Sequence, residues 1–257
     1  MERLLSAFLT LLPRTRNEYM SEHMRHSHGQ GNREIIKNYW MPLEGSHKIG
    51  AWEVLDAGYS EHNRAYHTWD HIAVLFEKLT AFSDLPARTD IIALSIFWHD
   101  AVYKTQNQDG SPLPDYENVC DSAELFRQYT LLKPSDADAV HDMIMATANH
   151  MQARAEKQYY PGFAGDLDLF LDLDLSSLAS SWEEFAEDFA KIRSEFFRVS
   201  EIDFCSKQIE ILENFAKDEV QLYRRAETRE KWREAARTNL KRCIAELTNR
   251  LAEISSP

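Results

Sequence analysis

The sequence predicts an all-α fold, and three observations support this class. Glycine and proline number only 8 each among 257 residues, too few for the many tight turns of an all-β protein. Hydrophobic residues make up 44% of the chain and aromatic residues 11%, which is enough for a large core. Most long segments also space their apolar residues at helical intervals. We therefore expect a single helical domain over residues 39–257, preceded by a flexible appendage over residues 1–38.

The charge and the cysteines restrict the partners and the compartment. A net charge of −13 argues against nucleic acid as a partner, because nucleic-acid binders need a basic surface. No apolar run approaches the roughly 18 residues of a membrane-spanning helix, so we expect no membrane partner. The three cysteines, Cys120, Cys205 and Cys243, are odd in number and lack a C-x-x-C spacing. They predict free thiols in a reducing, cytoplasmic environment.

The appendage has two features of its own. Its leucine-rich start, MERLLSAFLTLLPRTR, favours an amphipathic surface helix over a cleaved targeting peptide. His23, His26 and His28 follow within a polar, glycine-containing stretch. Three nearby histidines can bind a transition metal, but a flexible tail explains this composition better.

Two helices are expected ahead of the most apolar segment. Ser46 can cap a helix that runs through Ala57 and stops at Gly58. A second helix is predicted over residues 59–82, where His67 and His71 stand four residues apart and would share one face. Such a pair is a recurrent geometry for metal binding or proton transfer. One packed and one exposed histidine would give the same pattern.

Residues 90–104, DIIALSIFWHDAVYK, form the most apolar segment and the expected centre of the fold. Asp90 is a plausible N-cap, and the residues after it are apolar on nearly every helical face, which is typical of a buried helix. The run ends in His99 and Asp100. A buried carboxylate is costly unless it is paired or binds a metal, although an exposed helix end would also accommodate the two residues.

The following segments alternate between loop and helix. Residues 105–114 are predicted to be a loop, and a helix is expected to start at Asp115. A further helix over residues 135–150 contains a second pair, His141-Asp142, which we expect at the surface near a helix start.

The acidic segment over residues 166–178, DLDLFLDLDLSSL, is ambiguous. Its period of two is typical of a strand, but its helical neighbours would leave that strand without partners, and an EF-hand would need a turn glycine and a closing glutamate. The remaining interpretations are that Asp172 and Asp174 point inward at a helix start, or that they are solvated. Three helices are predicted to complete the chain, over residues 182–199, 201–223 and 228–254.

Imidazole and carboxylate groups together predict a transition-metal site. This donor set suits Mn, Fe, Co, Ni or Zn. A divalent ion bound by two histidines and two aspartates would lower the pKa of a coordinated water and polarise a phosphoryl oxygen. The sequence offers no glycine-rich phosphate loop and no G-x-S-x-G nucleophile motif.

The order His71, His99-Asp100, Asp174 resembles the H…HD…D signature of the HD-domain superfamily of metal-dependent phosphohydrolases. The chain is more closely similar to a predicted metal-dependent phosphohydrolase branch of that superfamily, over roughly residues 40–247. Six segments in the same order carry this resemblance: R-x-Y-H-x-x-x-H-I from Arg64, H-D-x-V-Y from His99, T-x-x-H from Thr147, D-x-D-L from Asp172, I-R-x-E from Ile192 and A-R-x-N-L from Ala236.

The resemblance implies an HD-domain-like helical bundle with additional C-terminal helices, and it implies roles for individual residues. The metal ligands would be His71, His99, Asp100 and Asp174, with Asp172 as the alternative last ligand. His67 would orient water, protonate the leaving group or bind a second ion. The implied reaction is attack of a metal-bound hydroxide on a phosphoester or phosphoanhydride.

The resemblance also implies which residues contact a small, phosphorylated and nucleotide-like substrate. These are Arg64, Lys104, His150 and Arg193, of which Arg193 could bind a phosphate with two parallel hydrogen bonds. Glu117 is a further catalytic candidate. Here the sequence departs from the branch's E-x-x-S-A pattern, because Ser122-Ala123 come two residues late. Assembly into a homo-oligomer stays open.

Two other functions are compatible with the same residues. An HD-fold oxygenase with two irons would need extra ligands, which His67, Glu117 and His150 could supply. A regulatory module could bind a metal or a nucleotide without turnover, but the complete H…HD…D set argues against a decayed site.

Overall fold

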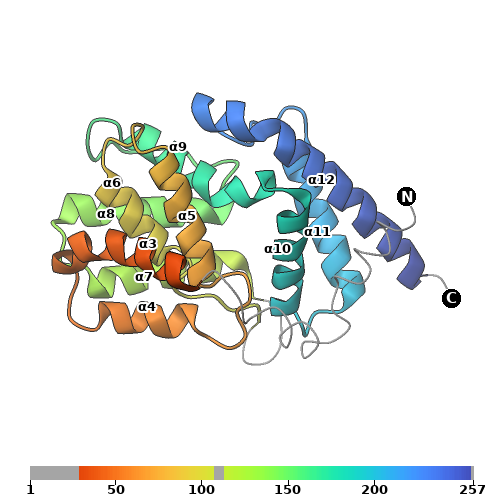
Figure 1. The fold of residues 1–257 in the computed structure, drawn as a ribbon, viewed down its shortest axis with the longest axis horizontal. Helices are drawn as coiled ribbons and strands as arrows, with labels where there is room; N and C mark the ends of the chain where they lie inside the picture. Colours follow the sequence, from red (N-terminus) through yellow and green to blue (C-terminus); the bar gives the residue numbers. More distant parts are fainter. Residues whose placement is uncertain (1–28, 107–112, 256–257) are drawn as a thin grey trace. The chain divides into compact units, whose positions relative to one another are not determined.

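A computed structural model describes residues 29–106 and 113–255, and Figure 1 shows that their regular structure is helical. Ten α-helices and no strand occur in these residues, which confirms the all-α class. The described residues form two compact units, one that ends at Asp174 and one that begins at Leu175. Most of the predicted appendage lies outside the described residues, but residues 29–38 belong to the first helix, α3, in which Ile36 is buried.

The first unit contains seven of the α-helices and two short 3-10 helices. They are α3 (Gly29–Trp40), η1 (Met41–Ser46), α4 (Ala51–Tyr59), α5 (Trp69–Ala81), α6 (Thr89–Trp98), α7 (Asp115–Tyr129), α8 (Pro134–Ala146), η2 (Thr147–Asn149) and α9 (Phe163–Asp174). The second unit contains η3 (Leu175–Ala179), α10 (Trp182–Glu195), α11 (Glu201–Ala216) and α12 (Ala226–Ser255).

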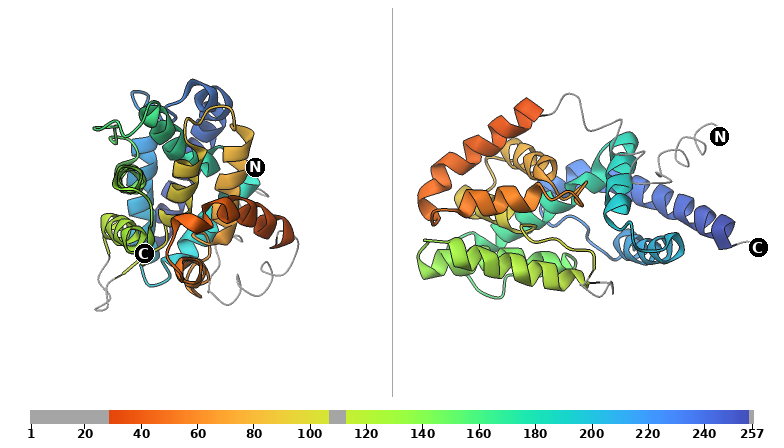
Figure 2. Two further views of the ribbon diagram at one scale, coloured as in Figure 1. Left: turned by 90° about the vertical axis from the view of Figure 1, so that its left-hand side faces the viewer. Right: turned by 90° about the horizontal axis from the view of Figure 1, so that it is seen from below.

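Helix α6 is the centre of the first unit, as the sequence predicts. Every residue from Ile91 to Trp98 is buried, because α5, α7, α8 and α9 all pack against this helix (Figure 2). The helix ends at Trp98, and His99 is its C-cap residue. The prediction that Asp90 caps the helix is wrong: Arg88 occupies the N-cap position, and the carboxylate of Asp90 accepts hydrogen bonds from the Arg88 guanidinium.

The helices on either side of residues 60–68 differ from the prediction. Helix α4 begins at Ala51, not at Ser46, and Gly58 lies inside it. Helix α5 begins only at Trp69, because Thr68 is extended and its side chain accepts the amide of Asp70 as an N-cap. His67 therefore precedes the helix, and the prediction that His67 and His71 share a helical face is wrong.

The ambiguous acidic segment is a helix despite its period of two. Asp166 is buried in the first turn of α9, where its carboxylate accepts hydrogen bonds from the amides of Ala87 and Arg88 and from the hydroxyl of Tyr160. Apolar residues on several sides of α9 are buried. The segment can therefore pack as a helix although its apolar residues alternate with polar ones. Asp174 is the last residue of α9, so the expectation that it lies at a helix start is wrong.

The second unit is built on the packing of α11 along α12. Of the five apolar positions expected to form a stripe along α12, Trp232, Ala236, Leu240 and Leu247 are buried and Ile244 is half-buried. Helix α11 ends at Ala216, seven residues earlier than predicted, and the chain then continues without regular structure to α12. All three cysteines are free thiols. Within the described residues no helix combines the length and the apolar character that a membrane span requires.

Candidate metal centre

Three helix termini of the first unit bring His71, His99 and Asp174 together. His71 lies in the first turn of α5, His99 caps the C-terminus of α6, and Asp174 ends α9. One potential ligand atom from each residue lies within 4.8 Å of the other two. Both histidines are buried, and the side chain of Asp174 is only 13% exposed. The three residues form a group that could hold a metal ion, and we call it the His/His/Asp cluster.

Asp100 adds a second carboxylate beside the two histidines. Its Oδ2 atom lies 3.1 Å from Nε2 of His99 and 3.7 Å from Nε2 of His71. Burial would raise the pKa of Asp100, but the charge of His99 and its hydrogen bond hold that pKa well below the ordinary value. Asp100 is therefore an ionised group at the edge of the cluster.

His99 presents one ring nitrogen to the cluster and uses the other for a backbone contact. Its Nδ1 atom lies 3.0 Å from the carbonyl oxygen of Ile96, so a hydrogen bond there places the proton on Nδ1. Its buried Nε2 atom faces the carboxylates of Asp100 and Asp174, at 3.1 Å and 3.4 Å. Although burial lowers the pKa of His99, the carboxylates of Asp100 and Asp174 raise it well above its ordinary value, so a metal ion would displace a proton from Nε2. Without that proton, the imidazole donates from Nδ1 to a carbonyl and turns Nε2 toward carboxylates, which is the arrangement of a metal ligand.

Asp174 is the carboxylate that all the histidines of the site approach. Its Oδ1 atom lies 3.5 Å from Nε2 of His71 and 3.4 Å from Nε2 of His99, and its Oδ2 atom lies 2.7 Å from Nε2 of His150. Although burial raises the pKa of Asp174, His99 and the hydrogen bonds from the three histidines lower it well below its usual range. Of the two predicted alternatives, Asp174 joins the cluster, whereas Asp172 is buried elsewhere along α9 and is not part of the group.

Arg64 holds the turn that carries Asp100. Its guanidinium donates hydrogen bonds to the carbonyl oxygens of Asp100 at 2.6 Å and Ala101 at 3.0 Å, and to the carboxylate of Glu61. Arg64 is buried, and the ring of Tyr59 lies 5.5 Å from it. These contacts favour a positioning role for Arg64 over the predicted contact with substrate.

Helix α7 holds the segment after Asp100 through two polar side chains that the sequence interpretation missed. The side-chain amide of Asn118 bonds both the amide and the carbonyl of Lys104, and the hydroxyl of Ser122 bonds both backbone groups of Val102. Both side chains are buried. Their spacing of four residues on a buried helix face is the signal that could have identified them.

An aromatic group flanks the cluster. The ring of His67 stacks on Tyr103 with a centroid distance of 3.8 Å, and its centroid lies 6.1 Å from that of His71. The ring of Tyr66 lies 4.9 Å from His71. His67 thus adjoins the cluster from the segment before α5, without sharing its helix.

Asp115, the first residue of α7, is affected by the charges of the site. Burial and the charge of Asp100 raise the pKa of Asp115, while His67 and His150 oppose that shift. Glu117, the predicted catalytic candidate, is exposed on the first turn of α7, as is Asp115. The sequence interpretation treated Asp115 only as a helix start.

The remaining candidates have contacts of their own. Lys104 is exposed and pairs with Asp121 at 3.6 Å. In the second unit, the guanidinium of Arg193 donates hydrogen bonds to the carbonyl oxygens of Phe196 and Val199 and lies over the ring of Phe204. The predicted contacts of Lys104 and Arg193 with substrate stay predictions.

The second His-Asp pair of the sequence, His141-Asp142, lies on α8 and is not part of the His/His/Asp cluster. The hydroxyl of Tyr159 donates a hydrogen bond to Asp142.

The residues of the cluster fit a divalent transition metal. Two imidazoles and one or two carboxylates form a mixed nitrogen and oxygen donor set, which suits Mn, Fe, Co, Ni or Zn better than Ca or Mg. The buried Nε2 of His99 lies 3.1 Å from Asp100 and 3.4 Å from Asp174, close enough for one ion to bind all three groups. Comparisons of the chain with protein-family models, curated proteins and solved structures find no significant match. The structure therefore establishes an all-helical protein with a buried His/His/Asp cluster, without a family assignment.

Proposed function

We propose that this protein is a metal-dependent phosphohydrolase that acts on a small phosphorylated substrate. The observation that carries the proposal is the buried Nε2 atom of His99, which lies 3.1 Å from a carboxylate oxygen of Asp100 and 3.4 Å from one of Asp174. The order of these residues along the chain, which resembles the HD-domain signature, supports the choice of phosphoryl chemistry.

His71, His99 and Asp174 would hold the ion, and Asp100 would be the fourth ligand. A bound divalent ion supplies Lewis acidity, because it lowers the pKa of water and polarises a phosphoryl oxygen. The carboxylates remain ionised under neutral conditions, since their pKa values are lowered, and they offset part of the ion's charge. Binding of a cation would therefore release no proton from Asp100 or Asp174.

Other residues would contribute through hydrogen bonds and proton transfer. His150 contacts the second oxygen of Asp174 and thereby fixes the orientation of that carboxylate. His67, held in place by stacking on Tyr103, adjoins the cluster at a position suited to exchanging a proton with the leaving group. Lys104, whose backbone is hydrogen-bonded to Asn118, is the exposed cation closest in sequence to the cluster and would contact the substrate phosphate.

A phosphate-release assay tests this proposal. The full chain would be assayed against a panel of nucleotides and small phosphoesters, with Mn, Co, Ni and Mg each supplied. We expect release with at least one transition metal, loss of that activity in Asp100→Ala, and retained activity in the matched control His141→Ala. Absence of release by the wild-type protein under every condition, or full turnover in Asp100→Ala, would refute the assignment. Circular dichroism would confirm that both variants are folded.

A di-iron oxygenase is the second candidate, and the position of His150 favours it. The Nε2 atom of His150 lies 2.7 Å from Asp174, so a third imidazole is available next to the cluster. Protein purified without added metal would then contain two irons per chain and show visible absorption. A single colourless divalent ion per chain would exclude this candidate.

A further inference from the structure

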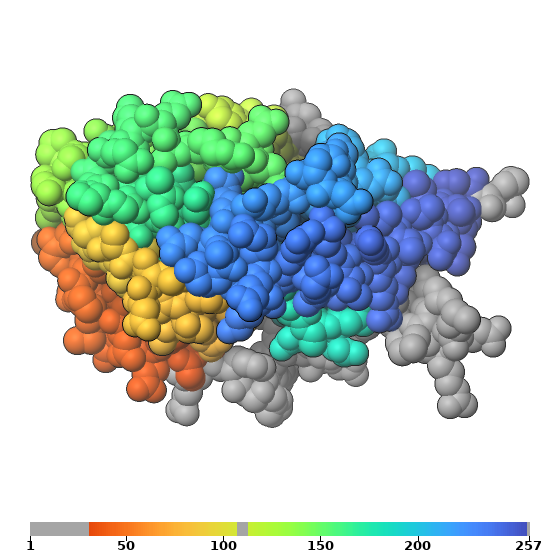
Figure 3. Space-filling view, turned by 90° about the horizontal axis from the view of Figure 1, so that it is seen from above, coloured from red at the N-terminus to blue at the C-terminus, as the bar shows by residue number. Residues whose placement is uncertain are grey.

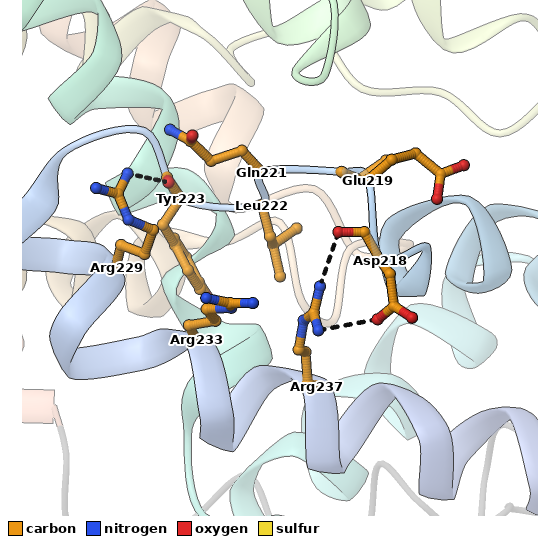
Figure 4. Close-up of a pocket in the computed structure, with 9 residues that line it drawn as sticks. Asp218, Glu219, Gln221, Leu222, Tyr223, Arg229, Arg233 and Arg237 are labelled. Carbon is orange, nitrogen blue, oxygen red and sulfur yellow. Dashed lines mark hydrogen bonds and ion pairs between the residues drawn. The ribbon is translucent and has the colours of Figure 1, made fainter.

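One cavity among the described residues includes no residue of the His/His/Asp cluster. It has a volume of about 390 Å³, within the range of small-molecule sites, and it lies within the second unit. Its walls are one face of α12 and the irregular segment that precedes that helix (Figure 4). The lining residues are Asp218, Glu219, Val220, Gln221, Leu222, Tyr223, Arg229, Arg233 and Arg237.

Three arginines give this cavity a basic wall. Arg229, Arg233 and Arg237 are four residues apart along α12 and therefore share one helical face. Figure 3 shows the residues of α12, coloured blue, at the surface of the molecule. Three guanidinium groups on one wall stand out in a chain whose net charge is −13. Only Asp218 and Glu219 among the lining residues carry negative charge.

The two outer arginines are held in place by the preceding segment. Arg229 donates hydrogen bonds to the carbonyl oxygens of Tyr223 and Arg224, and Arg237 donates to the side chain and the carbonyl oxygen of Asp218 (Figure 4). These contacts fix the position of both guanidinium groups, which reduces the entropy lost when a ligand binds. The side chain of Asp218 is 91% exposed, so its ion pair with Arg237 contributes little and a stronger anion can replace it.

Arg233, between them, retains most of its donor capacity. Its one ion pair within the described residues joins Nε to Glu234 over 3.8 Å, and the Glu234 side chain is 88% exposed. A guanidinium has five N–H donors in a planar fork that matches the oxygens of a carboxylate or phosphate. Three guanidinium groups on one wall favour the doubly charged phosphate, which offers three acceptor oxygens, over a single carboxylate.

We propose that this cavity is an anion site that binds a phosphate group, with Arg233 as the central ligand and Arg229 and Arg237 beside it. No residue of the His/His/Asp cluster lines the cavity. The proposal therefore does not depend on the phosphohydrolase function, and the protein would bind phosphate here with or without a metal at the cluster.

Isothermal titration calorimetry of the full chain, treated with a chelator and dialysed, tests the proposal. Chelation removes any metal-dependent phosphate binding at the cluster. Inorganic phosphate and adenosine monophosphate are titrated separately into the wild-type protein, Arg233→Gln and the control Arg33→Gln. Arg33 is exposed on α3, and its replacement changes the net charge by the same amount.

We expect one phosphate per chain in the wild-type protein and in Arg33→Gln, and affinity weakened by at least about tenfold in Arg233→Gln. Equal affinity for both probes would identify free phosphate as the ligand, and tighter binding of adenosine monophosphate would identify the phosphate of a nucleotide. Absence of binding by the wild-type protein at millimolar phosphate, or equal affinity in wild type and Arg233→Gln, would overturn the proposal. Thermal unfolding of Arg233→Gln would verify that this half-exposed position tolerates the change.

Discussion

At the scale of single residues, the site depends on how each ligand is oriented by a neighbour. His99 is oriented by the carbonyl of Ile96, Asp174 by His150, and the turn of Asp100 by Arg64. Hydrogen bonds of this kind set the tautomer and the direction of a metal ligand. Their loss weakens metal binding even when every ligand remains. Arg64 is the clearest case, because it is buried and holds the turn through the backbone oxygens of Asp100 and Ala101.

Arg64→Lys is expected to weaken both the fold and the metal site. An ammonium cannot reproduce the planar fork that reaches the carbonyls of Asp100 and Ala101, so a buried carbonyl loses its partner. The free energy of unfolding should fall by about 1–3 kcal/mol, and metal affinity should fall with it. Urea unfolding and metal titration would measure both effects. The control Arg33→Lys, at an exposed position, should change neither stability nor metal affinity. Equal stability of Arg64→Lys and the wild-type protein would show that the planar guanidinium is not needed.

At the scale of elements, the position of the His99-Asp100 turn is set by close packing of α4 as well as by hydrogen bonds. A Cβ atom added to Gly58 would lie 2.6 Å from the carbonyl oxygen of Ala101. Real side chains do not approach a backbone oxygen so closely, so either α4 or the turn would have to move. The sequence interpretation took Gly58 as a helix stop, because closeness to another segment has no local signal.

Gly58→Ala should therefore destabilise the protein although alanine is the better helix former. Helix propensity alone would favour alanine by about 1 kcal/mol, and the clash with Ala101 should exceed that gain. Gly31→Ala, in α3 and with no atom within 4 Å of the added Cβ, is the matched control and should be neutral or slightly stabilising. Comparison of the two melting temperatures shows whether the clash with Ala101 outweighs the gain in helix propensity. A Gly58 variant as stable as the Gly31 variant would mean that α4 adjusts freely.

A second contact between elements makes stability depend on pH. Buried His47 accepts the indole N–H of Trp98 at Nε2, 3.1 Å away, and its Nδ1 lies 3.0 Å from the carbonyl oxygen of Leu43. Burial lowers the pKa of His47, against the opposing effect of the Leu43 contact. The neutral ring is thus the form compatible with the fold, since protonation would place a second N–H against that of Trp98.

Because the folded-state pKa of His47 is lowered, its contribution to stability is present above the ordinary histidine pKa of about 6.5 and is lost as the pH falls through the folded-state value. His47→Gln keeps a hydrogen-bond acceptor but cannot titrate. Urea unfolding at pH 5 and pH 7.5 should show a smaller loss of stability on acidification in the variant than in the wild-type protein. An identical loss in both would assign the acid sensitivity to other groups.

At the scale of the whole molecule, the sequence predicted the fold class more reliably than the boundaries of the helices. The all-α class follows from composition, and the burial of α6 follows from the nearly unbroken apolar run from Ile91 to Trp98, so both could be predicted. The start of α5 was missed, although Thr68 is a residue type that caps helices and so gave a local signal for it. His71, His99 and Asp174 were identified from their order, whereas Asn118 and Ser122 were missed, because their partners are backbone groups that only the folded chain brings near.

Metal removal is expected to lower the stability of the whole protein. A ligand that binds only the folded state stabilises it by about 2.7 kcal/mol at 100 times its Kd. For a protein of this size, that corresponds to a decrease in melting temperature of roughly 5–10 °C on chelation. Scanning calorimetry with and without chelator would measure the shift, and resupplied metal should reverse it. A melting temperature unaffected by chelation and by added Mn, Co, Ni, Fe or Zn would argue against a metal at the cluster.

The most direct test of the central claim is the metal content of the purified protein. Elemental analysis by mass spectrometry would compare the wild-type chain, His99→Gln and His141→Gln, since both histidines precede an aspartate and only His99 belongs to the cluster. The proposed site predicts about one divalent transition metal per chain in wild type and His141→Gln, and loss of that metal in His99→Gln with helical circular dichroism retained. Equal metal content in all three proteins, or its loss in His141→Gln alone, would contradict the assignment of the His/His/Asp cluster as the metal site.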